Sequence, residues 1–316
     1  IRHNLTSREQ EQDNIQIEFL VTLTLEKESS LVKVDIEVEN KAIEHRVRVL
    51  FKTGIESVES IADQQFGTIR RPVYLSEVEN WRENGWNEKP RTIEPMQSFV
   101  SLANDHENVS IITDCVREYQ ITGEKFDTIA LTLFRSTPEM GKAELKDRPG
   151  RASGMANWET PDANLLKNLK FNFAISIGKN EYSISKISNI SKEYLTPFYY
   201  YQAAEFKNVD IFFLMNKPEI QDVPFDYSIF SSENRNCILS TVKKAEKENA
   251  LIIRVYNPDD KKSTDFDIIY HDDIKNTSLV KFDEETVMDN VEFSFDGNKI
   301  NISEVKTCQA LSIKVK

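Results

Sequence analysis

Hydrophobic and polar residues alternate along most of this chain with a period of two. The clearest run covers residues 15–25, where apolar side chains occupy every second position, with one interruption at Leu20. The same alternation returns at residues 32–38, 47–51, 129–133 and 169–177. Successive side chains of a strand point to opposite faces, so each run predicts a strand with one face in a core and one in water. No amphipathic helix longer than about two turns stands out. The pattern therefore predicts an all-β fold.

Two long stretches interrupt the predicted strands, and together they hold all three tryptophans. Residues 63–98 contain Trp81 and Trp86, while the stretch that follows the strand at 127–134 contains Trp158. Loops of such length inside a compact domain usually have a function or pack across a sheet. A tryptophan in such a loop either stacks on a sugar or anchors the loop through a large apolar ring, and the residues leave both interpretations open.

The composition of the chain changes around residues 195–225. Prolines and the three consecutive tyrosines at 199–201 mark a boundary there, which divides the chain into domains at 1–205 and 206–316. Shorter strands follow at 251–256 and 266–270, and Asp296-Gly297-Asn298 is typical of a hairpin turn between two more. Strands at this spacing predict a second, smaller β-sandwich.

Composition narrows the class of protein. The 316 residues carry a net charge of -12, which disfavours a general nucleic-acid binder because such proteins need a basic face. No apolar run is long enough to span a membrane. The three cysteines lie far apart, so we expect a reducing compartment, the cytoplasm, rather than a disulfide framework. The chain starts at Ile1 rather than Met, which suggests a piece of a longer polypeptide.

The sequence shows no catalytic apparatus of its own. It contains no glycine-rich phosphate loop and no G-x-S-x-G nucleophile elbow. Its four histidines lack the paired spacing of a zinc site, and none of its many carboxylates is marked as a catalytic pair. We therefore predict no catalytic residue and no metal ligand within these residues.

Residues 145–155 are the most informative stretch. Asp147, Arg148 and Arg151 lie beside Pro149 and Gly150, whose backbone preferences would present the two guanidinium groups from a shaped loop. Arginine suits partners rich in oxygen. A plain surface turn anchored by a salt bridge is the simpler interpretation, because glycine–proline turns are common connectors.

This loop and several other segments together resemble the C-terminal β-region of glycoside hydrolase family 38, the zinc-dependent α-mannosidases, and its bacterial members in particular. The segments are residues 46–51, 66–72, 145–155, 239–245, 251–257 and 302–307. The resemblance runs from about residue 15 to residue 316 and rests on the order and spacing of the segments.

The resemblance implies a mutarotase-like supersandwich followed by a smaller β-sandwich. Family enzymes cleave α-mannosides with retention of configuration, using an aspartate nucleophile and a zinc ion held by an N-terminal catalytic domain. This chain has no equivalent of that domain, so the resemblance implies a non-catalytic region that is inactive alone. Its partners would be the α-mannoside substrate and the catalytic domain of the same polypeptide, and zinc would be bound outside these residues. A homo-oligomer is compatible with these expectations and is not required by them.

In the family, an arginine on a matching loop points toward the sugar. The resemblance assigns that substrate-binding role to Arg151, with Asp147 as the partner that orients it and Arg148 beside it. An arginine fork can hold two sugar oxygens or a carboxylate, so an anionic aglycone such as glycerate would fit.

Two alternatives stay open. One is a free-standing carbohydrate-binding sandwich that uses Trp81, Trp86 or Trp158 as stacking platforms. The other is a structural scaffold whose loops only seal an interface between domains.

Overall fold

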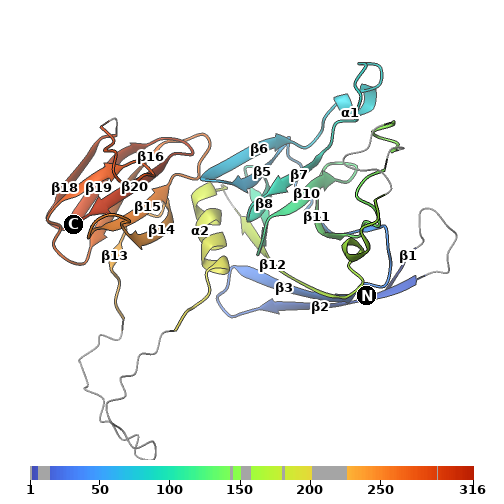
Figure 1. The fold of residues 1–316 in the computed structure, drawn as a ribbon, viewed down its shortest axis with the longest axis horizontal. Coiled ribbons are helices and arrows are strands. Elements are labelled where there is room, and N and C mark those ends of the chain that lie inside the picture. The colour runs from blue at the N-terminus through green and yellow to red at the C-terminus, as the bar shows by residue number, and fades with distance from the viewer. Residues whose placement is uncertain are drawn as a thin grey trace, which may run out of the picture. The chain divides into compact units, whose positions relative to one another are not determined.

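The structure is a computed structural model, and it describes residues 2–5, 15–142, 145–150, 158–179, 182–200, 226–289 and 291–316 (Figure 1). It divides into two compact units, Ile1–Ile187 and Ser188–Lys316. The domain boundary expected between residues 205 and 206 falls within 201–225, outside the described residues. That boundary stays a prediction.

The first unit is built on an eight-stranded antiparallel sheet, which takes up the longest alternating runs of the sequence. Its strands follow the order β1-β2-β3-β12-β9-β8-β5-β6. In that order they are β1 (Arg2–Leu5), β2 (Ile15–Leu25), β3 (Leu31–Glu39), β12 (Asn168–Lys179), β9 (Glu107–Thr113), β8 (Phe99–Ala103), β5 (Glu59–Gln64) and β6 (Gly67–Pro72).

A four-stranded antiparallel sheet forms the other layer of this unit. Its strands are β4 (Arg46–Lys52), β11 (Thr128–Arg135), β10 (Arg117–Thr122) and β7 (Ile93–Met96), in that order. The apolar faces of the two sheets share one core. The ring of Phe51 from β4 meets that of Phe173 from β12 edge-on, with 5.6 Å between ring centres. Alternating strands have thus produced a two-layer sandwich, as sheet packing requires.

The second unit is a smaller sandwich of two four-stranded antiparallel sheets. One contains β13 (Phe230–Ser231), β16 (Thr264–Tyr270), β19 (Lys299–Val305) and β18 (Phe293–Asp296). The other contains β14 (Ile238–Lys244), β15 (Leu251–Tyr256), β20 (Ala310–Val315) and β17 (Thr277–Val280). The predicted hairpin is present between β18 and β19, with Gly297 at a φ of 59°. The expected all-β order, a large sandwich followed by a smaller one, is confirmed.

Two expectations about local structure were wrong. The stretch 63–98 was expected to interrupt the strands, but it contains β6, β7 and the short helix α1 (Glu77–Asn80). β6 lies at the edge of its sheet and is largely polar, so its sequence lacks the apolar alternation of an inner strand.

A helix was also missed. α2 (Ile184–Leu195) exceeds three turns, and its buried face consists of Ile184, Ile187, Ser188 and Ser191. Half of that face is serine, so the hydrophobic period is weak even though burial follows helical spacing. The remaining helical element described is the 3-10 turn η1 (Pro161–Asn164).

Candidate functional site

The described part of the loop at 145–150 is a tight turn held by its own backbone. The backbone N–H of Arg148 donates to the carbonyl of Leu145 at 3.0 Å, and the two residues pair as an isolated β-bridge. Gly150 follows with a φ of 70°, a left-handed conformation that favours glycine. The sequence expectation that glycine shapes this loop is therefore confirmed for these residues.

A second loop, between α1 and β7, holds this turn through three contacts. The backbone N–H of Lys89 donates to the Asp147 carbonyl at 2.9 Å. Arg82 Nη2 donates to the Lys146 carbonyl at 3.2 Å, and Arg91 Nη1 donates to Asp147 Oδ2 at 2.8 Å. Two stretches that the sequence singled out separately are therefore joined in the fold, by backbone as well as by charge.

Between the two loops lies a hollow of about 530 Å³, which we call the tryptophan hollow. Its lining comes from both loops: Trp81, Arg82, Gly85, Trp86, Asn87, Pro149 and Gly150. Trp81 is only 7% exposed, and the Arg82 guanidinium lies 5.0 Å from the centre of its ring. Trp86 is 45% exposed. One tryptophan therefore anchors the loop, and the other presents its ring to solvent.

The three predicted substrate-binding residues differ in where they lie and in what they contact. Arg151 lies outside the described residues. The carboxylate of Asp147, expected to orient Arg151, forms an ion pair with Arg91. Arg148 Nε is buried and has no hydrogen-bond partner in the described part of the chain. The structure places Asp147 and Arg148 on one anchored turn, and their role toward a substrate stays a prediction.

Sequence reasoning missed Arg82 and Arg91. Arg82 directly follows Trp81, which is a visible signal, because arginine stacks readily on tryptophan. Arg91 carries no such signal, since its partner Asp147 lies 56 residues away along the chain. Trp158 is 54% exposed and does not line the tryptophan hollow.

A polar network crosses the edge of the first sandwich, next to a cavity of about 200 Å³. The buried hydroxyl of Tyr119 lies 3.0 Å from Ser60 Oγ and accepts from Arg71 Nη1 at 3.3 Å. Arg71 Nε in turn pairs with Glu94 Oε2 at 3.1 Å. Ser60 and Arg71 belong to the large sheet and Tyr119 and Glu94 to the small one, so the network links the two layers.

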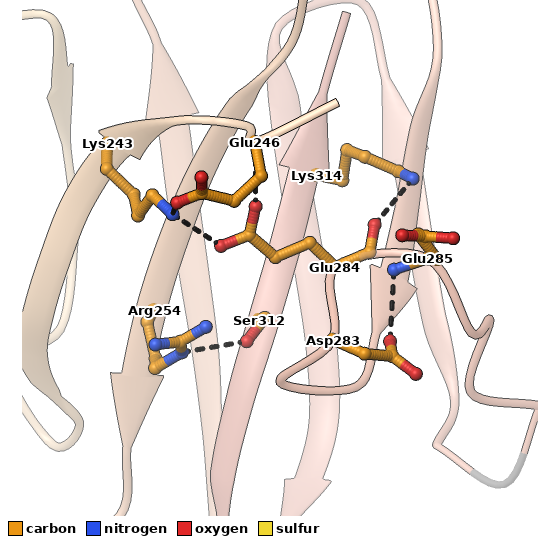
Figure 2. A network of polar contacts seen from close by, with 8 residues as sticks. All are labelled: Lys243, Glu246, Arg254, Asp283, Glu284, Glu285, Ser312 and Lys314. Atoms are coloured by element: carbon orange, nitrogen blue, oxygen red, sulfur yellow. Dashed lines mark hydrogen bonds and ion pairs between the residues drawn. The ribbon is translucent and has the colours of Figure 1, made fainter. Parts of the chain in front are cut away.

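The second unit contains another polar cluster, centred on Glu284 (Figure 2). The Glu284 carboxylate accepts from Lys243 Nζ at 2.8 Å and from the Glu246 N–H at 3.0 Å, and these contacts lower its pKa. Its carbonyl accepts from Lys314 Nζ at 2.9 Å. Next to it, the side chain and backbone of Thr286 and the Glu285 N–H lower the pKa of Asp283 to about 2. The contacts tie a loop onto the β14–β15–β20–β17 sheet, so the cluster stabilises structure.

Neither a metal centre nor a membrane helix is found in the described residues. No three side chains among their His, Cys, Asp and Glu come together as metal ligands would. Among the same residues, no helix combines the length and the apolar character that crossing a bilayer requires.

Comparison with known proteins shows that two models of one protein family match this chain. The model for the "Glycosyl hydrolases family 38 C-terminal domain" matches residues 5–139, and that for the "Glycosyl hydrolases family 38 C-terminal beta sandwich domain" matches residues 236–314. A putative mannosylglycerate hydrolase from Halalkalibacterium halodurans is 25% identical over 271 residues, which cover 84% of this chain and 26% of that protein.

Two solved structures share the fold. An α-mannosidase from Enterococcus faecalis superposes with a TM-score of 0.74 at 18% identity, over 96% of this chain and 29% of its own. A protein in glycosyl hydrolase family 38 from the same organism gives a TM-score of 0.71 at 17% identity, over 96% and 30%. The chain therefore spans less than a third of the length of the relatives it matches.

Proposed function

Because this chain belongs to the C-terminal β-region of glycosyl hydrolase family 38, we propose that it is the non-catalytic part of a longer, retaining, zinc-dependent α-mannosidase. The observation that carries this proposal is that both C-terminal family models match in order, while the chain covers only 26% to 30% of its relatives. The remaining length of such an enzyme would hold the N-terminal catalytic domain. Hydrolysis of a mannoside would belong to that longer protein.

Zinc would be bound outside this chain. The described residues bring together no set of His, Cys, Asp or Glu that could hold a metal, so they do not fit a zinc ion. The proposed contribution of this chain is to support the catalytic domain and to supply one loop to the substrate site.

That loop would be the turn at 145–150 with its continuation. Three contacts from the loop between α1 and β7 hold the turn, and Gly150 is its last residue. A turn held in this way would present the next residue, Arg151, from a fixed base. A guanidinium fork could then bind two oxygens of an α-mannoside, or the carboxylate of an anionic aglycone such as glycerate.

The proposed cellular compartment of the protein rests on its cysteines. The cysteines at 115, 237 and 308 are free thiols. Free thiols are typical of a reducing compartment, which supports the cytoplasm as the proposed location. The proposed role of the longer enzyme there is mannoside breakdown.

The test is kinetic and uses the intact enzyme. We expect Arg151→Ala to lower kcat/KM by an order of magnitude or more, with the thermal unfolding midpoint unchanged. Arg151→Lys should recover only part of the loss, because lysine keeps the charge but not the fork. Arg235→Ala is the matched control, since Arg235 forms an exposed ion pair with Glu193 in the second unit. Unchanged kinetics in Arg151→Ala would remove the loop from the substrate site, and hydrolysis of an aryl mannoside by the 316-residue chain alone would overturn the non-catalytic role.

A further inference from the structure

We propose that the tryptophan hollow is a binding site for a neutral pyranose ring, which stacks on Trp86. This inference goes beyond the function proposed above, because it assigns a binding activity to this chain by itself. It needs neither Arg151 nor a catalytic domain. The sugar would be a part of a mannoside at some distance from the bond that is cleaved.

The backbone of Trp86 is held by hydrogen bonds within its own loop. The backbone N–H of Trp86 donates to the carbonyl of Trp81 at 3.0 Å, and the Trp81 side chain is buried. The Gly85 N–H donates to the Arg82 carbonyl at 3.0 Å in the same turn. Trp86 as a residue is nevertheless 45% exposed. A large ring on a hydrogen-bonded stretch of backbone, left in contact with water, can offer its apolar face to a ligand.

The hollow leaves room for a ring to approach the backbone. Gly85 and Gly150 lie on opposite loops at φ values of 71° and 70°. A Cβ built on either glycine meets no atom within 4 Å, so the space beside each is open. Glycine is the usual residue where a ligand must come close to the main chain. The volume of about 530 Å³ also lies within the range of small-ligand sites.

The polar lining favours a neutral ligand over an ion. Among the lining residues that the structure describes there is no carboxylate, which disfavours a cation. Arg82, the cationic side chain among the described lining residues, already donates to the Lys146 carbonyl and lies against the Trp81 ring, which lessens its pull on a phosphate. The Asn87 amide can both donate and accept. A neutral pyranose, with an apolar face and hydroxyls at its edge, matches a stacking ring flanked by one guanidinium and one amide.

The experiment titrates the 316-residue chain with methyl α-mannoside and with mannotriose, followed by the tryptophan indole N–H signals in NMR spectra. We expect saturable binding that shifts the Trp86 signal most. Trp86→Ala should weaken binding tenfold or more, whereas Trp86→Phe should keep most of it because an aromatic face remains. Trp158→Ala is the matched control, because Trp158 is at least as exposed but lies outside the hollow.

Three outcomes would overturn the inference. They are the absence of saturable sugar binding, an equal loss in Trp158→Ala, and displacement of the sugar by inorganic phosphate at lower concentration. Unfolding curves of each variant separate loss of binding from loss of fold, and Trp86→Phe keeps the test valid if the alanine variant does not fold. The result is independent of the proposed function, because the kinetics of Arg151→Ala in the intact enzyme test that function without reference to Trp86.

Discussion

Arg91 Nη1 lies 2.8 Å from Asp147 Oδ2, and this ion pair joins two loops that are 56 residues apart in the chain. The carboxylate is about one-third exposed and the guanidinium about half exposed. The Lys89 N–H donates to the carbonyl of the same Asp147. The side chain and the backbone of Asp147 therefore both fasten the turn that precedes Arg151. The side-chain contact is the ion pair with Arg91.

Loss of this ion pair should loosen the turn without unfolding the protein. A half-exposed pair contributes about 0.2–1 kcal/mol, so Arg91→Ala should lower the free energy of unfolding by less than about 1 kcal/mol. Hydrogen exchange at the Lys89 amide should nevertheless become several-fold faster, because the acceptor at Asp147 is no longer held. Lys170→Ala, which removes an exposed pair with Glu37, is the control and should leave that amide unchanged. Unaltered exchange in Arg91→Ala would show that backbone contacts alone hold the turn.

Tyr119→Phe should destabilise the first sandwich. The change removes a buried hydroxyl that contacts Ser60 and Arg71, and we expect a loss of about 1–2 kcal/mol in the free energy of unfolding, measured by urea denaturation. Tyr74→Phe is the matched control, because its hydroxyl donates to Glu79 at an exposed position. The control should cost less than about 0.5 kcal/mol. Equal losses for the two tyrosines would contradict a structural role for the network between the layers.

Gly123→Ala should be more costly than Gly54→Ala, although both glycines have positive φ. At Gly123, with a φ of 94°, a Cβ would lie 2.7 Å from Asp127 Oδ1 and 3.1 Å from Thr128 Oγ1. At Gly54, with a φ of 74°, a Cβ meets nothing within 4 Å. We expect about 1–2 kcal/mol of backbone strain in each variant, with a further loss only in Gly123→Ala. Thermal unfolding of the two variants checks this, and indistinguishable midpoints would show that the Asp127 side chain moves aside freely.

Cys237 should make the second unit lose stability at alkaline pH. Burial raises the pKa of this thiol from 9.0 to about 12. Between these values the unfolded thiol loses its proton while the folded thiol keeps it, so ionisation favours the unfolded state. Its stabilising contribution is therefore complete below pH 9.0 and declines above it, by at most about 1.4 kcal/mol per pH unit.

The measurement is the free energy of unfolding of the native chain and of Cys237→Ala between pH 7 and 11. The difference between them should shrink above pH 9.0, since only the native chain carries the thiol. In the folded protein, Cys237 should also resist alkylation by iodoacetamide, whereas the exposed Cys115 should react. A difference in unfolding free energy that stays constant with pH would refute the raised pKa.

The sequence by itself determined the strands that alternate clearly, because the alternation that reveals a strand is a local property of the backbone. Residues 251–256 were predicted as a strand and form β15, and the hairpin around Gly297 follows from the backbone freedom of one glycine. The resemblance carried by the ordered segments was also visible in the sequence, and both family models confirm it. The alternation of apolar residues and the residues that favour turns can both be recognised from the sequence alone.

Only the tertiary structure decided which apolar faces are covered and which distant loops meet. The alternation of β2 continues to Leu23 and Leu25, yet both are exposed while Ile17 is buried, because burial depends on the layer that faces the strand. The helix α2 buries serines beside isoleucines, which no apolar period announces. Arg91 reaches Asp147 only because the fold brings the two loops together. Contacts across such separations depend on the packing of whole sheets, and no local pattern encodes them.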